Sequence, residues 1–206
     1  MKYMILIGIL FGMQTSLLSQ HANVESTFMN EKIKNQYTFF KDFESTKFSF
    51  FNLTSVSADY NFGRASESYL IDNFLFYQIK NRISLAVEGA VNQKVFIVAI
   101  GTRYTYTKNN FRFAFFPSYR ISDKRSLYTR ILLEYQSPIS SRVSLYFRGQ
   151  FNASTNFSGE SGLSNLYRLG LQYKNIRMGL GTPWFKPLEE RAFRSKHLGF
   201  FLAVTL

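Results

Sequence analysis

The clearest pattern of apolar and polar residues lies in residues 83–120, where three runs alternate between apolar and polar or small side chains. Two short polar segments, 92–94 and 108–110, separate these runs. Successive side chains of a β-strand point to opposite faces, so a period of two predicts strands with one apolar and one polar face. The segment therefore predicts an up-and-down β-meander. In its middle run, one parity holds Phe96, Val98, Ile100, Tyr104 and Tyr106.

The same alternation extends along most of the chain that follows residue 45. It predicts an all-β, up-and-down antiparallel transmembrane β-barrel of about ten strands, within a range of about eight to twelve, over residues 46–206. Residues 20–45 are polar with scattered aromatic side chains, and we expect them to form a periplasmic lead-in or a plug in the lumen. The remaining alternating runs are 47–60, 70–80, 127–136, 143–152, 166–174, 176–182 and 197–206.

The connections between these runs indicate which solvent the apolar face meets. Short turns (80–82, 108–110, 137–141 and 174–175) alternate along the chain with connections that include longer ones (63–68, 153–165 and 183–195). Outer-membrane barrels have short turns at the periplasmic rim and longer loops at the outer rim, whereas a soluble sandwich has no reason to sort its loops this way. The apolar face is therefore predicted to contact lipid.

The final run ends the chain with apolar residues on one parity, namely Phe200, Leu202, Val204 and Leu206. This resembles the C-terminal targeting strand of small outer-membrane β-barrel proteins of Gram-negative bacteria. That strand usually ends on an aromatic residue, and Leu206 departs from this feature. The resemblance implies a location in the cell outer membrane, and it names a class of protein rather than a function.

The N-terminal residues resemble neither a strand nor a membrane-spanning helix. Lys2 precedes a short apolar run at residues 5–11, and small polar residues follow from Ser16. A charged start, a short apolar centre and a small-residue end are typical of a secretory signal peptide. The apolar run is too short to span a bilayer as a helix. We therefore assign residues 1–19 to a signal peptide.

Composition narrows the chemistry that is available. The formal net charge of +12 favours anionic partners, and at an outer membrane these include the phosphates of lipopolysaccharide. The chain has no cysteine and only two histidines, which excludes disulfides, thiolate metal sites and multi-histidine metal sites. No phosphate loop or dinucleotide motif occurs, so we expect no cofactor. Export makes a nucleic-acid partner improbable, and strand alternation explains the interleaved arginine and aromatic residues.

If the apolar parity faces lipid, the opposite parity lines the barrel and is rich in arginine. Buried charges need partners or water, so we expect arginine–carboxylate pairs around Glu88 and Glu134, with surplus arginine facing water. Two interpretations follow. The charges either fill a small barrel and make it rigid, or they form a narrow anion-favouring passage. The predicted lumen residues are Glu88, Arg103, Arg112, Arg120, Arg130, Glu134, Arg148, Arg168 and Arg177.

The outer rim holds two further candidates. His197 is the candidate catalytic residue, because lipid-modifying barrels use a base-activated serine at this rim, although no spacing identifies the serine here. The connection 183–195 combines aromatic anchors with mixed charge and is a candidate surface for a protein partner. Its candidate partner-binding residues are Trp184, Phe185, Arg191 and Phe193.

The sequence supports three functions in order of preference. The first is a non-enzymatic structural or accessory subunit of an envelope complex. The second is a narrow anion-preferring pore. The third is a lipid hydrolase or acyltransferase that uses His197 at the rim.

Overall fold

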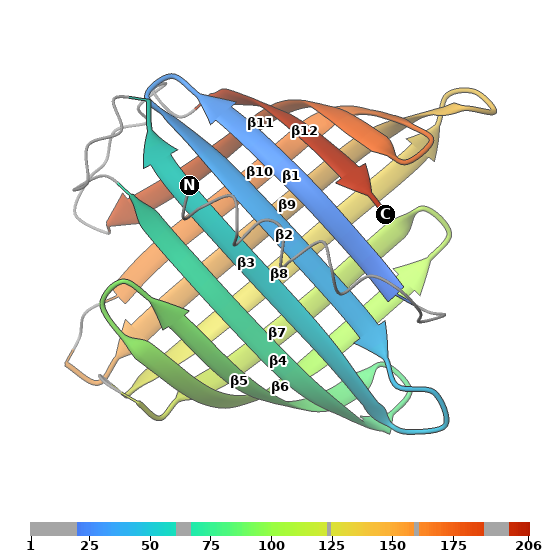
Figure 1. Ribbon diagram of the computed structural model, residues 1–206. Coiled ribbons are helices and arrows are strands. Elements are labelled where there is room, and N and C mark those ends of the chain that lie inside the picture. Colours follow the sequence, from blue (N-terminus) through green and yellow to red (C-terminus); the bar gives the residue numbers. More distant parts are fainter. Residues whose placement is uncertain (1–19, 61–66, 123–124, 159–160, 188–197) are drawn as a thin grey trace, which may run out of the picture.

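The chain forms one closed barrel of antiparallel strands in a computed structural model (Figure 1). The structure describes residues 20–60, 67–122, 125–158, 161–187 and 198–206. Each strand pairs with the next one in the sequence, and β1 pairs with β12 to close the ring. The all-β, up-and-down architecture is confirmed. The described residues form twelve strands rather than about ten, which is the upper end of the expected range.

The twelve strands have the following bounds. They are β1 (Gln20–Met29), β2 (Lys32–Asp42), β3 (Phe48–Asp59), β4 (Ser68–Lys80), β5 (Ile83–Asn92), β6 (Phe96–Lys108), β7 (Phe111–Arg120), β8 (Ser126–Pro138), β9 (Val143–Asn156), β10 (Ser161–Tyr173), β11 (Ile176–Pro187) and β12 (Gly199–Thr205).

The two additional strands come from the segment that was expected to be a lead-in or plug. Residues 20–42 instead form β1 and β2, which lie in the barrel wall between β12 and β3. Their outer faces do carry apolar residues, such as Phe28 opposite Ile33. Ser26 and Asn35 stand opposite each other on the same face and interrupt the apolar series, so the alternation is hard to detect. The predicted signal peptide at residues 1–19 lies outside the described residues and stays a prediction.

One rim of the barrel is made of tight turns. Among the residues that the structure describes, four adopt a positive φ without being glycine, and all four lie in connections at this rim. Side chains other than glycine occupy this left-handed region mainly in turns, so these residues mark sharp chain reversals. At the other rim, strands continue into the segments predicted as the loops 153–165 and 183–195. The four turn residues are Ser45, Arg82, Asn109 and Lys174.

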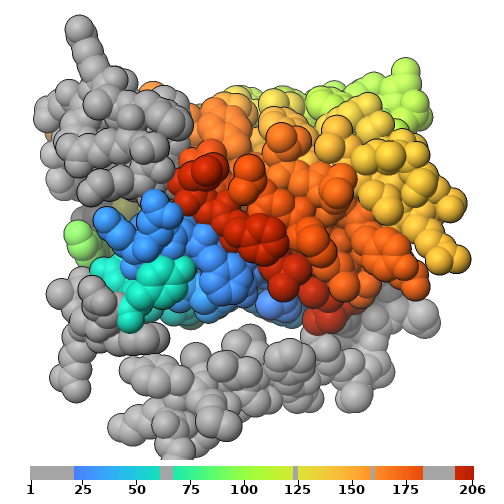
Figure 2. Space-filling view, turned by 90° about the horizontal axis from the view of Figure 1, so that it is seen from above, coloured from blue at the N-terminus to red at the C-terminus, as the bar shows by residue number. Residues whose placement is uncertain are grey.

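The outer and inner faces invert the usual distribution of polarity. Large apolar side chains such as Val87 and Leu169 point outward and are 52% and 54% exposed. Asp72 and Glu88 point inward and are almost completely buried. An apolar exterior around a polar interior is the arrangement of a barrel that spans a membrane. Figure 2 shows β1 and β12 side by side on this outer surface. Among the described residues, no helix is long and apolar enough to cross a membrane.

Two aromatic clusters fill parts of the interior. One contains Phe74, Phe76 and Phe116, on β4 and β7. The other contains Tyr146 and Phe201, whose ring centroids lie 6.2 Å apart. Between these two residues, the register places a pair of glycines on the same inner face. The row across β9 to β12 is Tyr146, Gly170, Gly179 and Phe201, so the missing side chains leave room for both rings.

Candidate functional site: an arginine-lined lumen

The nine predicted lumen residues all lie on inward-facing positions of β5 to β11. The strand register explains why they gather. Cross-strand neighbours on one face include Arg112 with Glu134, Glu134 with Arg148, and Arg148 with Arg168. Side chains directly opposite each other in antiparallel strands have Cβ atoms about 5 Å apart, so this row concentrates like charges as well as opposite ones. The lumen therefore has a strongly cationic stripe along β7 to β10.

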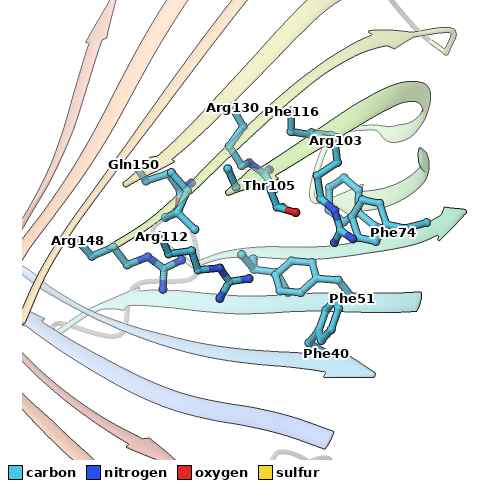
Figure 3. A pocket seen from close by; sticks show the side chains of 14 residues that line it. Phe40, Phe51, Phe74, Arg103, Thr105, Arg112, Phe116, Arg130, Arg148 and Gln150 are labelled. Carbon is cyan, nitrogen blue, oxygen red and sulfur yellow. The ribbon is translucent and has the colours of Figure 1, made fainter. Parts of the chain in front are cut away.

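Four arginines converge on a central cavity of about 110 Å³ (Figure 3). Arg112 and Arg148 reach into it from β7 and β9, and Gln150 lies beside them. Arg103 and Arg130 extend from β6 and β8. The cavity thus presents several hydrogen-bond donors from guanidinium groups to anything that enters it.

Aromatic rings form the other side of this cavity. The rings of Phe74 and Phe76 are stacked with centroids 5.7 Å apart, and Phe116 meets Phe74 edge-on at 5.0 Å. The guanidinium carbon of Arg103 lies 3.6 Å from the centroid of the Phe76 ring. A cation over a ring face is stabilised by the ring quadrupole, which is one way to hold an arginine that has no carboxylate partner. Phe40 and Phe51 complete the apolar side.

Ion pairs cross the lumen between strands that are not neighbours. Arg130 on β8 pairs with Asp72 on β4 at 3.2 Å, and Arg168 on β10 pairs with Glu25 on β1. A third pair joins Arg177 on β11 to Glu134 on β8 at 3.8 Å. Because these contacts span the interior instead of following one wall, they narrow the passage.

The carboxylates differ in part from the expected set. Glu134 does pair with an arginine, but within the described residues Glu88 has no ion pair. Asp72, which lies diagonal to Glu88 on the neighbouring strand β4, pairs with an arginine in its place. Glu25 was missed because it lies in the segment assigned to a lead-in. Its inward position opposite Gln36 becomes visible only when β1 is recognised as a strand.

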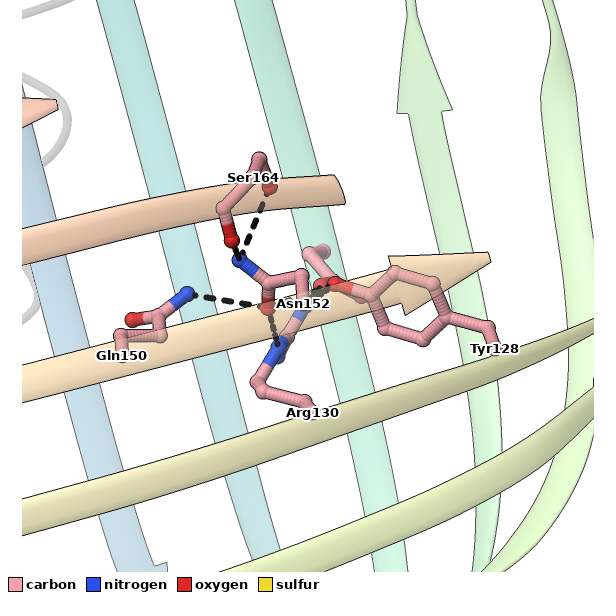
Figure 4. Close-up of polar contacts among 6 residues, drawn as sticks. Tyr128, Arg130, Gln150, Asn152 and Ser164 are labelled. Carbon is pink, nitrogen blue, oxygen red and sulfur yellow. Dashed lines mark hydrogen bonds and ion pairs between the residues drawn. The ribbon is translucent and has the colours of Figure 1, made fainter. Parts of the chain in front are cut away.

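A hydrogen-bond network centred on Asn152 positions the Arg130 head group (Figure 4). The side-chain oxygen of Asn152 accepts hydrogen bonds from the hydroxyl of Tyr128 at 2.9 Å and from Nε of Arg130 at 3.3 Å. The amide nitrogen of Asn152 donates to the hydroxyl of Ser164 at 3.1 Å. Arg130 is therefore fixed from the wall on one side and by Asp72 on the other.

The remaining arginines form a cationic surplus. Among the described residues, Arg103, Arg112, Arg120 and Arg148 have no carboxylate within ion-pair distance. The Nε atoms of Arg103, Arg120 and Arg148 are buried without a hydrogen-bond partner there. Buried charged donors without partners are costly, so these groups favour an anion or water in the lumen.

Two larger cavities lie between the central cavity and the rim of tight turns, and each shares lining residues with the central one. One of about 450 Å³ shares Phe40, Arg103 and Thr105 with it, and one of about 370 Å³ shares Arg112. Arg120 instead lines a cavity of about 270 Å³ toward the other rim, with no lining residue in common with the central one. Arg130 lines the central cavity, and its partner Asp72 lies in the same cross-strand row as Ile97, which lines the cavity that contains Arg120.

The rim candidates are only partly described. The backbone of β11 continues through Trp184 and Phe185, which pair with Asn165 and Ser164, so the loop predicted to begin at residue 183 starts later. Arg191, Phe193 and His197 lie outside the described residues, and the catalytic role considered for His197 stays a prediction.

Comparison with known proteins identifies the fold. No protein-family model matches the chain, and no curated protein matches its sequence. Among solved structures, the chain is similar to KdgM porin, with a TM-score of 0.53 and 9% identity over 90% of this chain and 97% of that one. It is also similar to NanC porin, with a TM-score of 0.51 and 6% identity over 91% and 98% of the two chains. KdgM porin in complex with disordered oligogalacturonate gives 0.51 and 8% identity over 90% and 97%.

At these identities the likeness concerns the fold alone. The chain has the fold of a bacterial outer-membrane β-barrel protein. This agrees with the apolar exterior and the polar, charged interior described above. The expected class of fold is confirmed, and it agrees with the expected location in the outer membrane. The function is carried by the lumen residues of this chain and is argued from them below.

Proposed function

We propose that the protein is a narrow outer-membrane passage that favours anionic solutes. The observation that carries this proposal is the central cavity, where Arg103, Arg112 and Arg148 converge without a carboxylate partner among the described residues. Arginine rings act as selectivity elements in pores because they attract anions and repel cations at close range. The two adjoining cavities, which share lining residues with the central one, support a route from the rim of tight turns to these arginines.

The lining also suggests the class of solute. Guanidinium groups recognise carboxylates through paired hydrogen bonds, and the aromatic side of the cavity suits an apolar or ring face. A small organic anion with a ring, such as an acidic sugar, has both features. KdgM porin has been solved in complex with oligogalacturonate, an acidic oligosaccharide, which supports this class without assigning it.

A second candidate, a non-enzymatic structural or accessory barrel, is favoured by a different observation. Three ion pairs cross the lumen and would obstruct any large solute. In this interpretation the charges make the barrel rigid, and its role in the envelope depends on a partner. The two candidates differ in whether the lumen conducts.

Reconstitution in planar bilayers tests the passage. With a salt gradient across the membrane, the reversal potential of the wild-type protein should show a preference for anions. Arg148→Glu should shift this potential toward cations, because it reverses a charge that lines the central cavity. Arg142→Glu is the matched control, since Arg142 lies in the exposed turn between β8 and β9. Absence of any current would overturn the proposal of a passage and would favour a structural or accessory role for the barrel.

A further inference from the structure

The lipid-facing surface of β1 to β4 carries a polar patch. Asn52 and Asn73 stand directly opposite each other on the outer face of β3 and β4. Apolar neighbours on the same face of β4, Ile71 and Leu75, flank Asn73 on both sides, so this amide lies within the apolar band. The patch comprises Ser26, Asn35, Asn52, Thr54, Asn73 and Gly89.

The register makes these residues contiguous. Ser26 stands opposite Asn35 on β1 and β2. Asn35 is paired directly with Val56, and Thr54 is paired directly with Tyr37. Asn35 and Thr54 are therefore diagonal neighbours across β2 and β3. Side chains in diagonal positions of adjacent strands remain within reach of one another. The patch therefore continues from β1 to β4 without an intervening apolar strand.

Hydrogen bonds within the patch use its oxygen atoms and leave amide hydrogens free. The amide nitrogen of Asn52 donates to the side-chain oxygen of Asn73 at 2.9 Å, and the hydroxyl of Thr54 donates to the oxygen of Asn52 at 3.1 Å. The hydroxyl of Ser26 donates to the oxygen of Asn35 at 2.7 Å. Among the described residues, no acceptor is present for the amide nitrogens of Asn35 and Asn73. Hydrocarbon offers no acceptor either, so a bare patch is costly in a bilayer.

The surface beside Asn73 is also recessed. Gly89 on β5 stands opposite Asn73 on the outer face, and open space lies in front of its α-carbon. Small residues at contacts inside a membrane let two backbones approach closely, which strengthens packing and interchain hydrogen bonds. The amides and this open space lie side by side on the outer face of β4 and β5.

We infer that a second copy of this chain packs against this patch in the membrane. A carboxamide carries both a donor and an acceptor, and its oxygen has two lone pairs, so identical patches related by a two-fold axis satisfy each other. The free amide hydrogens of Asn73 in one copy then donate to the carboxamide oxygen of Asn73 or Asn52 in the other. Acyl chains cannot make this bond. The inference does not depend on whether the lumen conducts.

Single cysteines provide a direct test, because the natural chain contains none. Leu75→Cys places a thiol next to the patch, and Leu169→Cys places one on β10, away from it. The two parent side chains are similarly exposed, at 45% and 54%. Mild oxidation of native membranes should link the Leu75→Cys protein to itself and leave the Leu169→Cys protein monomeric. Equal linkage at both sites, or no linkage at Leu75→Cys, would overturn the inference.

Removal of the amides provides the second test. In the Leu75→Cys background, Asn52→Leu with Asn73→Leu should abolish the linked dimer. These changes remove unsatisfied polar groups from lipid, so the barrel should still fold, which its heat-modifiable migration on a gel reports. Asn165→Leu is the control, because Asn165 is a lipid-facing amide on β10 outside the patch. A dimer that persists without Asn52 and Asn73, or linkage to a different protein in place of a second copy, would count against the inference.

Discussion

Arg130 and Asp72 form an ion pair across the lumen, with Nη2 of Arg130 3.2 Å from Oδ2 of Asp72. Three strands lie between β8 and β4 along the shorter path round the barrel, so the pair ties together wall segments that share no backbone hydrogen bonds. The Asp72 side chain is only 2% exposed. Its charge therefore depends on this arginine, and the pair both braces the barrel and closes its centre.

Loss of one partner should destabilise the barrel strongly. Asp72→Ala leaves Arg130 without its carboxylate, and removal of one member of a buried pair costs about 3 kcal/mol or more. Asp72→Ala combined with Arg130→Met should recover most of this loss, because neither member of the pair is then left as a charge without its partner. Denaturant-induced unfolding of the barrel in lipid vesicles gives the free energies. Equal destabilisation by the single and double variants would contradict this account.

If the protein is a passage, as we propose, the same double variant should also change its conductance. Arg130 lines the central cavity but not the cavity that contains Arg120, and we expect removal of the pair to open a path between the two. Single-channel conductance should rise relative to the wild type. As a control, Glu25→Ala with Arg168→Met removes a crossing pair whose residues line neither of these two cavities, and it should leave the conductance unchanged. A conductance unchanged by removal of the central pair would show that the pair is not the constriction.

A substitution at Glu25 tests whether the N-terminal strands are part of the barrel wall. Glu25→Gln should destabilise the barrel by about 3 kcal/mol, because it leaves the buried Arg168 charge without its carboxylate. Glu44→Gln is the matched control in the exposed turn between β2 and β3, and it should change stability by no more than about 0.5 kcal/mol. If residues 20–45 were only a lead-in, both variants would unfold at the same denaturant concentration.

The glycine pair on β10 and β11 should not tolerate a side chain. A Cβ atom on Gly170 would meet the carbonyl oxygen of Met178 and the α-carbon of Gly179, so the two strands would have to separate. Gly170→Ala should therefore lower the yield of folded, heat-modifiable barrel. Gly181→Ala is the control, because the nearest atom to its added Cβ lies at an ordinary contact distance of 3.6 Å. Similar folding yields for both variants would mean that the strands adjust more easily than their spacing suggests.

The sequence predicted those parts of the fold where one parity is uninterrupted. In β5 and β6 every lipid-facing position near the middle is apolar or small, and the strand boundaries follow directly. β1 and β2 escaped prediction because Ser26 and Asn35 occupy lipid-facing positions, where the expected pattern requires apolar residues. If a second copy covers that surface, its contact with Ser26 and Asn35 explains why polar residues occupy these lipid-facing positions.

In the lumen too, the sequence predicts which face a residue lies on but not its contacts with residues of distant strands. The alternation of residues within a single strand is enough to assign its arginine to the inner face. The lining residues could therefore be predicted from the sequence. The pairing of Arg168 with Glu25 could not, because the two residues are 143 positions apart and meet only across the interior. Which carboxylate faces which arginine depends on the number of strands and on their stagger. Two missed strands were enough to hide that contact.

Closure of the wall by β1 and β12 has a consequence for assembly. Asn23 and Thr205 are register partners 182 positions apart, so the first strand of the wall receives one of its neighbours only after nearly the whole chain has been synthesised and exported. Until then its unpaired backbone groups cannot enter hydrocarbon without a large penalty, and in water they are free to pair with other chains. The barrel is thus expected to insert late and as a unit, and a chaperone that shields one open strand edge would limit aggregation before closure.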